Sequence, residues 1–134
     1  MKTEALQMPQ AVQDLILLAL NRMGIQKTSV TDDVLAADIY YEYGTELSIL
    51  ILCVVQRKLL FKNKPAILVS ISQRDRAGQI EKVFDQDFIP YPRSANDLPF
   101  VIRLSAKIKT LAWYTGQAYG FGPCLTFVNE NVAD

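Results

Sequence analysis

The sequence predicts an α+β fold in one domain that spans residues 1–134. The expected elements are an N-terminal helix, an antiparallel or mixed sheet of three to five strands, a C-terminal helix and a last strand. Three observations predict this fold: an apolar stretch with strand character in the middle of the chain, helical periodicity on both sides of it, and a globular composition. Half of the residues are apolar and 21% are charged, and a chain of this length can bury a substantial core.

The first expected element is a helix over residues 8–24. Apolar residues recur there at helical spacing, while polar residues occupy the other side. Pro9 fits the first helical turn, and Gly24 fits the position just after the helix end. We expect this helix to pack its apolar face against a sheet.

A β-hairpin is expected over residues 47–72, the most apolar stretch of the chain. Residues 47–55 are apolar at every position except Ser48, which indicates a strand that is buried on both sides. Residues 66–72 alternate in character and place β-branched side chains on one face, which indicates a half-buried strand. The turn between the two strands is expected at Asn63-Lys64-Pro65, because these residue types favour turns.

Two segments have an alternative interpretation as helices. Residues 45–62 also fit a buried helix with Thr45 as its cap and basic residues near its end. Residues 31–44 begin with Thr31-Asp32-Asp33, which is typical of a helix start, and end with a glycine. However, residues 37–43 alternate and contain three tyrosines, which favours a strand. We expect a helical turn or loop over residues 31–36 and the first strand of a meander over residues 37–43.

The sequence predicts three further elements after residue 72. Residues 79–88 place apolar side chains at helical intervals, which indicates a short helix. The proline-rich segment 89–99 is expected to be an extended crossing. Residues 100–117 indicate a longer helix that Asp97 caps and that a glycine-rich segment ends. Residues 124–128 are expected to form the last strand.

Composition excludes several classes of site. The chain contains no histidine, so Ser-His-Asp and Cys-His nucleophilic catalysis are excluded. The glycines at 116, 120 and 122 do not lie between a strand and a helix, so they do not form a phosphate-binding loop. The two cysteines are isolated and form no zinc signature. We therefore expect no cofactor and no catalytic residue. We also expect no membrane association and a cytoplasmic location, because no apolar run approaches the ~20 residues of a membrane span and no secretory signal is visible.

Nucleic acid is a possible partner that the overall charge does not favour. The candidate phosphate contacts are six basic residues, most of them in the expected hairpin: Arg57, Lys58, Lys62, Lys64, Arg74 and Arg76. Residues 1–46 contain three Lys/Arg and seven Asp/Glu, a balance of −4, so the rest of this neutral chain carries +4. The sequence pI of 6.2 is nevertheless far below the value above about 9 that a basic nucleic-acid binder shows.

The expected order of elements resembles the core of the PD-(D/E)XK nucleases. In that family an acid on the second strand and a Glu-x-Lys on the third hold a divalent metal. Asp38 and Glu42 are the carboxylates that this resemblance offers as metal ligands. The slot on the third strand is Ser70-Ile71-Ser72, which has neither the acid nor the lysine. The resemblance therefore implies a divergent metal-dependent nuclease or a nucleic-acid-binding domain derived from one.

The sequence favours a non-catalytic interaction protein over that alternative. Four aromatic residues lie close together in the sequence, at the end of the second long helix and in the glycine-rich segment: Trp113, Tyr114, Tyr119 and Phe121. Aromatic residues are enriched at protein–protein interfaces. We expect these four to line a contact with a protein partner or, in a homodimer, with a second copy of the chain.

Overall fold

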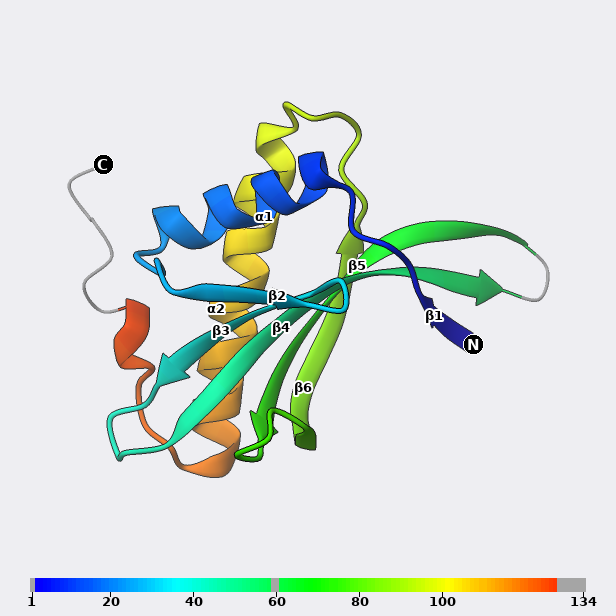
Figure 1. Ribbon diagram of the computed structural model, residues 1–134. Coiled ribbons are helices and arrows are strands. Elements are labelled where there is room, and N and C mark those ends of the chain that lie inside the picture. The colour runs from blue at the N-terminus through cyan, green and yellow to red at the C-terminus, as the bar shows by residue number, and fades with distance from the viewer. Residues whose placement is uncertain (1, 59–60, 128–134) are drawn as a thin grey trace.

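The computed structural model describes residues 2–58 and 61–127, without the side chains of residues 2, 3, 57, 58, 61 and 62. The described elements, drawn in Figure 1, are β1 (Lys2–Ala5), α1 (Gln10–Arg22), β2 (Thr28–Thr31), β3 (Val34–Tyr40), β4 (Glu46–Lys58), β5 (Phe61–Arg74), β6 (Ile80–Pro90), α2 (Leu98–Tyr119) and the short 3₁₀ helix η1 (Leu125–Phe127). The predicted α+β class is confirmed.

The strands form one antiparallel sheet around β4. Its order is β2-β3-β4-β5-β6, so consecutive strands are neighbours, and β1 pairs with β4 beyond the end of β3. Residues 46–52 of β4 pair with β3, and residues 54–57 pair with β1. The described sheet therefore has six strands rather than the expected three to five, because β1 and β2 are short and polar and because β6 occupies a segment predicted to be helical.

The expected hairpin over residues 47–72 is present as β4 and β5, and the alternative helix over residues 45–62 is wrong. The expected turn is also wrong, because Asn63-Lys64-Pro65 lies within β5, where Lys64 is opposite Gln56 and Pro65 is opposite Val55. The described pairing of β6 with β5 extends only to Ala66 opposite Pro90. Pro65 lies beyond that point, where the missing proline N–H costs no ladder hydrogen bond to β6.

Both predicted long helices are confirmed. Pro9 is the N-cap residue of α1, and Gly24 follows its last turn with a φ of 86°. The Asp97 side chain accepts a hydrogen bond of 3.0 Å from the backbone N–H of Phe100 and caps α2 as expected. Gly120, with a φ of 71°, ends α2 in the left-handed conformation that glycine adopts without steric cost.

Three predictions in the irregular segments are wrong. Residues 31–36 are not a helical turn, because Asp32 and Asp33 adopt φ values of 52° and 61° and connect β2 to β3 in a tight hairpin. Residues 79–88 are not a helix but the main part of β6. Residues 124–128 are not a strand as far as they are described, because residues 125–127 form η1 and only an isolated bridge joins Cys124 to Tyr41. Residue 128 lies outside the described residues.

A register irregularity explains why the pattern of β6 was misinterpreted. Ile71 is opposite Asp85 and Ser72 is opposite Val83, so Phe84 is an extra residue on β6. Such a bulge interrupts the period of two that identifies a strand. The apolar residues on either side of it then fall at intervals that imitate a helix.

The two helices pack on one face of the sheet. Their buried residues form one hydrophobic cluster with the odd-numbered residues of the central strands, including Ile49 and Ile51 of β4 and Ile67, Val69 and Ile71 of β5. Figure 1 shows α2 passing behind the sheet and the β4–β5 hairpin extending beyond the body of the domain. Among the described residues, no helix is long and apolar enough to cross a membrane.

Candidate functional site

An uncharged line of side chains runs along α2 on the side away from the sheet. The buried side of α2 consists of Phe100, Val101, Leu104, Ile108, Leu111, Ala112, Thr115 and Gly116. Opposite them, at spacings of three and four residues, lie exposed residues that we call the outward face of α2: Pro99, Ile102, Ala106, Thr110, Trp113 and Gln117. The solvent side of a surface helix is normally charged or strongly polar. The outward face departs from this pattern, and the exposed Arg103, four residues after Pro99 and three before Ala106, lies directly beside it.

Trp113 and its neighbour Tyr114 are the largest side chains on this side of α2. They are 55% and 56% exposed, and their rings meet edge to face with centroids 5.0 Å apart. Ile102, a little more than three helical turns away, is 60% exposed. The pair is thus held in shape by its own contact while most of its surface remains open to a partner.

Tyr119 and Phe121 belong to a different aromatic cluster beside β6. Their rings stack with centroids 5.8 Å apart, and Phe84 meets Tyr119 edge to face at 4.7 Å. The Lys82 ammonium lies over the Phe84 and Tyr119 rings, 4.7 and 4.8 Å from their centroids. Phe121 and Phe84 are only half-buried, and Tyr119 is 45% exposed. Of the four aromatic residues predicted to line a contact, the structure thus places two in each of two clusters.

The glycine-rich segment after α2 is packed tightly against the turn between β3 and β4. Backbone hydrogen bonds run from Glu42 N–H to the Pro123 carbonyl at 2.9 Å and from Tyr43 N–H to the Phe121 carbonyl at 3.3 Å. The Tyr41 hydroxyl donates to the Ala112 carbonyl at 2.8 Å, and burial raises the pKa of Tyr41, so the hydroxyl stays a donor. These bonds fix the end of α2, and with it both aromatic clusters, to the sheet.

The six basic residues proposed as phosphate contacts do not form one described patch. The side chains of Arg57, Lys58 and Lys62 lie outside the described residues, and Lys64 is exposed on the rim of a hollow of about 490 Å³ between β5 and β6. Arg74 and Arg76 lie at the other end of the sheet, beside a second hollow of about 490 Å³. Its carboxylates, Asp38, Glu46 and Asp75, outnumber these two arginines, which reduces the attraction for an anion.

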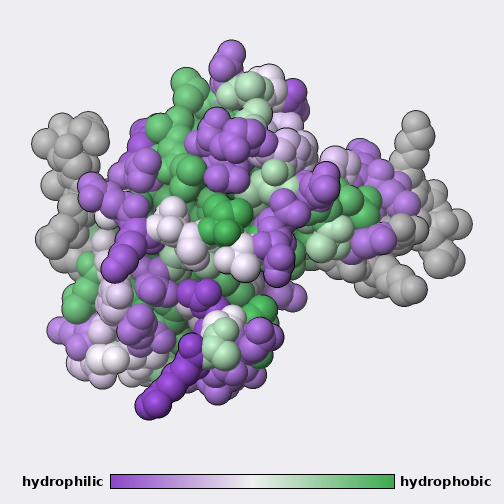
Figure 2. Space-filling view, in the orientation of Figure 1, coloured by the Kyte–Doolittle hydropathy of each residue, from purple (hydrophilic) through white to green (hydrophobic). Residues whose placement is uncertain are grey.

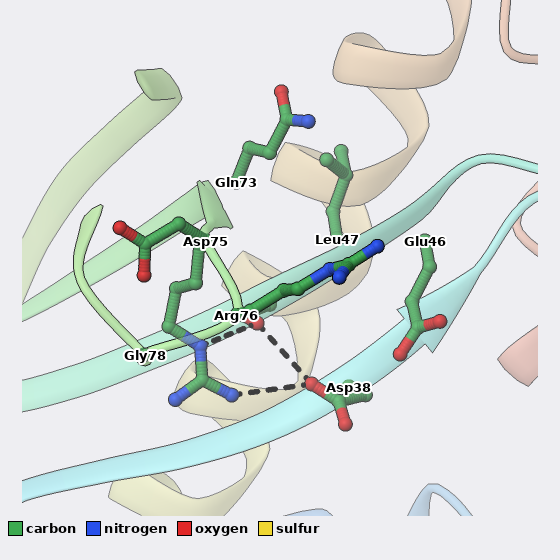
Figure 3. A pocket seen from close by; sticks show the side chains of 9 residues that line it. Asp38, Glu46, Leu47, Gln73, Asp75, Arg76 and Gly78 are labelled. Carbon is green, nitrogen blue, oxygen red and sulfur yellow. Dashed lines mark hydrogen bonds and ion pairs between the residues drawn. The ribbon is translucent and has the colours of Figure 1, made fainter. Parts of the chain in front are cut away.

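Hydrogen bonds hold the polar side chains at the base of this second hollow (Figure 3). Arg74 Nε donates to Ser48 Oγ at 2.9 Å, and Arg74 Nη2 pairs with Asp38 Oδ1 at 3.3 Å. Ser48 Oγ in turn donates to the same Asp38 oxygen at 3.2 Å. In Figure 3 the Arg76 side chain extends over the hollow from the loop that follows β5. The base of the hollow is therefore a network whose members already have partners.

The two carboxylates of the nuclease alternative do not meet at one site. Asp38 is on β3 and bonds to Ser48 and Arg74, whereas Glu42 is exposed in the turn after β3. Ser70 and Ser72, in the slot for the third-strand motif, bond to each other at 2.7 Å. Within residues 2–58 and 61–127, no three His, Cys, Asp or Glu side chains are grouped so that they could hold a metal ion.

Sequence reasoning did not find the second face of the sheet, which is apolar although neither helix packs on it. Residues directly opposite one another in an antiparallel pair point to the same face. Val34 of β3, Leu52 of β4, Leu68 of β5 and Phe88 of β6 are opposite one another in that order, and all four are half-buried. We call this side the open face of the sheet.

The open face continues along the strands on both sides of that row. Leu50 and Ser70 lie on one side of it, and Val54 and Ala66 lie on the other. Figure 2 shows apolar and hydrophilic residues interspersed over the visible surface of the domain. The signal for this face was present in the sequence, because the unbroken apolar run of residues 47–55 predicted burial on both sides, whereas the helices cover only one.

Comparisons with known proteins show no relationship: no family model, no curated protein and no solved structure matches the chain.

Proposed function

We propose that this protein is a small cytosolic, non-catalytic interaction protein that associates with a second copy of itself through the aromatic end of α2. The observation that supports this most directly is the outward face, where Trp113 and Ile102 are more than half exposed and Arg103 is the charged residue beside them. Exposed aromatic side chains of this kind are typical anchors of protein interfaces.

The arrangement of the outward face suits pairing with an identical helix. Small residues, Ala106 and Thr110, lie between Ile102 and Trp113. If two copies of α2 cross in opposite directions there, Ile102 of one copy is brought to Trp113 of the other, which is the symmetry of an isologous dimer. Small side chains at the crossing allow the helix axes to approach to about 8 Å.

The accessible area is compatible with a modest interface. A tryptophan or tyrosine that is half exposed offers roughly 100 Å², and Trp113, Tyr114 and Ile102 are each 55–60% exposed. Together they supply roughly 300 Å², over a third of the ~800 Å² per partner that a standard interface buries. The smaller residues of the outward face supply much of the rest, so we expect a reversible dimer rather than an obligate one.

The charges of α2 give this dimer a characteristic salt dependence. The helix carries Arg103, Lys107 and Lys109 and no acidic residue. Lys107 pairs with Asp87 at 2.7 Å, and the exposed Arg103 beside the outward face is the like charge that two copies of α2 bring together. Because salt screens this repulsion and strengthens apolar burial, we expect dimerisation to strengthen as ionic strength rises.

Sedimentation over a range of protein concentrations tests the proposal. We expect Trp113→Ala to weaken the dimer by about tenfold or more, since truncating a buried aromatic anchor costs about 2 kcal/mol. Tyr40→Ala is the matched control, because Tyr40 is also 50% exposed but lies on the open face of the sheet. A wild-type chain that remains monomeric at every concentration, or a Trp113→Ala dimer as stable as that of the wild type, would refute the proposal.

The second candidate function, a divergent metal-dependent nuclease or a nucleic-acid binder derived from one, receives less support. Its carboxylates are separated, and Arg74 is already paired with Asp38. Calorimetry with Mn²⁺ and a salt-dependent DNA-binding assay test this alternative directly. Heat of metal binding that Asp38→Asn abolishes, or DNA binding that Arg76→Ala weakens at every salt concentration, would favour it.

A further inference from the structure

The sheet loses one strand where β6 ends, and a hollow lies beside this step. Pro90 is the last residue of β6 and is opposite Ala66 of β5, whereas β5 stays paired with β4 at Pro65. Prolines at both positions lack the N–H that would continue a hydrogen-bond ladder. Figure 1 shows the β4–β5 hairpin continuing past the end of β6. The hollow, which we call the Pro90 hollow, has a volume of about 490 Å³, within the ~300–1,000 Å³ of small-molecule sites.

Apolar rings form the walls of the Pro90 hollow. Phe88 and Tyr91 contribute half-buried aromatic side chains, and Pro65 and Pro90 contribute exposed pyrrolidine rings. Tyr91 packs against the hydrophobic core, and the two prolines have a fixed φ. The walls therefore need little ordering when a ligand enters, which preserves the free energy gained by burying an apolar ligand.

Three of the lining residues carry hydrogen-bond donors. They are the Lys64 ammonium, the Gln56 side-chain amide and the Tyr91 hydroxyl. Partial burial raises the pKa of Tyr91, so its hydroxyl keeps its proton at neutral pH. Within the part of the chain that the structure describes, neither Lys64 nor Gln56 has a side-chain partner, and Lys64 is the one charged residue that lines the hollow. A ligand with a negative charge would therefore meet an unpaired cation and no carboxylate.

The hollow at the other end of the sheet has a different character. It has about the same volume of 490 Å³, but its lining includes three carboxylates and two arginines: Asp38, Glu46, Asp75, Arg74 and Arg76. Arg74 already pairs with Asp38. The carboxylates would repel an anion there, and the charged lining offers little apolar surface. The Pro90 hollow is the better site for a ligand that is both apolar and anionic.

We propose that the Pro90 hollow binds a small carboxylic acid with an apolar body. The body lies against the rings of Phe88, Tyr91 and the two prolines, and the carboxylate lies beside Lys64. Charge complementarity decides the class of ligand, because Lys64 attracts a carboxylate, is indifferent to an alcohol and repels an amine. None of the described residues on the outward face of α2 lines this hollow, so the proposal is independent of the dimer.

Hydrocinnamate and hydrocinnamyl alcohol test this proposal, because they share an apolar body and differ in the carboxylate. NMR titration of the full chain reports both the site and the affinity. We expect hydrocinnamate to shift the backbone N–H signals of Lys64 and Tyr91 and the side-chain amide signals of Gln56, with a dissociation constant on the order of millimolar for so small a probe. The alcohol should shift the same signals but bind about threefold to fivefold more weakly.

The carboxylate contact is assigned by two lysine variants. Lys64→Gln should reduce the affinity for hydrocinnamate to that for the alcohol and leave binding of the alcohol unchanged. Lys27→Gln is the matched control, because Lys27 is also exposed but does not line the hollow, and it should change neither affinity.

The apolar contact is assigned by a change in the wall. Phe88→Ala should weaken binding of both ligands by about fivefold. If Phe88→Ala does not fold, Phe88→Leu replaces it, with an expected loss of about twofold for both. Trp113→Ala should bind both ligands normally, so this proposal and the dimer proposal can fail separately.

Several results would overturn the proposal. They are the absence of a saturable shift at Lys64, Gln56 and Tyr91, equal affinities for the acid and the alcohol, or a loss in Lys27→Gln as large as that in Lys64→Gln. Much tighter binding of a peptide that ends in a phenylalanine carboxylate would also overturn it, because the hollow would then hold the chain end of a partner protein.

Discussion

Replacing Gly116 with alanine should destabilise the protein, although the position lies inside α2. A Cβ atom at Gly116 would lie 2.4 Å from the carbonyl oxygen of Gly122 and 3.0 Å from Cε2 of Tyr41. The first contact is with backbone, so a side-chain rotation cannot relieve it. Gly122 and α2 must instead separate by about 1 Å to reach an ordinary van der Waals distance.

The hydrogen bonds of the following segment determine the cost of that separation. Phe121 N–H donates to the Gly116 carbonyl at 2.9 Å, and Glu42 N–H donates to the Pro123 carbonyl at 2.9 Å. Weakening both costs about 1–3 kcal/mol, and overpacking of this kind typically costs about 1–3 kcal/mol in total. Alanine recovers about 1 kcal/mol, because glycine is a poor helix former. We expect a net loss of up to about 2 kcal/mol in the free energy of unfolding.

Urea denaturation followed by circular dichroism measures this loss. Helix propensity alone predicts the opposite sign, a gain of about 1 kcal/mol, so the two explanations are separated by the direction of the change. Gln117→Ala on the exposed outward face is the control and should change the stability by less than about 0.5 kcal/mol. A Gly116→Ala variant more stable than the wild type would show that the end of α2 is not packed as described.

Three further predictions concern Asp97, the edge of β6 and Cys53. Asp97→Ala should lower the free energy of unfolding through loss of the α2 cap. Hydrogen bonds from the Arg93 and Phe100 N–H groups lower the pKa of Asp97, so this contribution is present above the unfolded-state pKa and is lost as the pH falls through the lowered pKa of the folded protein. Urea titrations that show the same difference between variant and wild type at neutral and at strongly acidic pH would contradict this. The double change Asp85→Ala and Asp87→Ala should increase association or aggregation, measured by light scattering. The two aspartates accept hydrogen bonds from the N–H groups of Gln86 and Phe88, and without them these N–H groups on β6 become available to another strand. Unchanged scattering would contradict this. Cys53 is fully buried, and desolvation is the main cause that raises its pKa to about 11. A thiol reagent at pH 8 should therefore leave Cys53 unmodified in the native protein and react with it in urea. Rapid modification of Cys53 in the native protein would contradict this.

The central hairpin and the two long helices were predictable because strong local signals and tertiary packing agree in them. In β4 the β-branched residues Ile49, Ile51 and Val54 favour a strand, and the structure buries all three. In α2, Asp97 caps the helix and a glycine ends it, as the sequence indicated. These segments need no knowledge of distant parts of the chain.

The errors fall where the conformation depends on a partner strand or on unusual backbone angles. The bulge at Phe84 is set by pairing with β5, and the sequence of β6 alone gives no sign of it. Asp32 and Asp33 resemble the acidic first turn of a helix, yet both adopt positive φ in a hairpin turn. The β4–β5 turn was misplaced because proline normally ends a strand, whereas Pro65 lies just beyond the residues of β5 that pair with β6.

The candidate surfaces were predictable only in part. The aromatic residues were identified from the sequence, but their division into the Trp113 pair and the Tyr119 cluster depends on which side of α2 each residue occupies. The open face was missed because an apolar run was interpreted as burial between two layers. Only the structure shows that Leu52 and Leu68 face away from both helices.

The stability of the isolated domain does not account for the exposed apolar residues on the outward face of α2. A side chain that is more than half exposed, such as Ile102 or Trp113, contributes less than half of the burial free energy of a core residue, which is about 1.5–3 kcal/mol for complete burial of a large apolar side chain. Polar residues at these positions would therefore cost the fold little and would increase solubility. The reasoning does not extend to Leu52 and Leu68, which are half-buried and therefore keep a larger share of that burial free energy. Because folding makes so weak a demand for apolar residues at positions 102 and 113, the exposure of Ile102 and Trp113 is what the proposed contact with a second copy would explain.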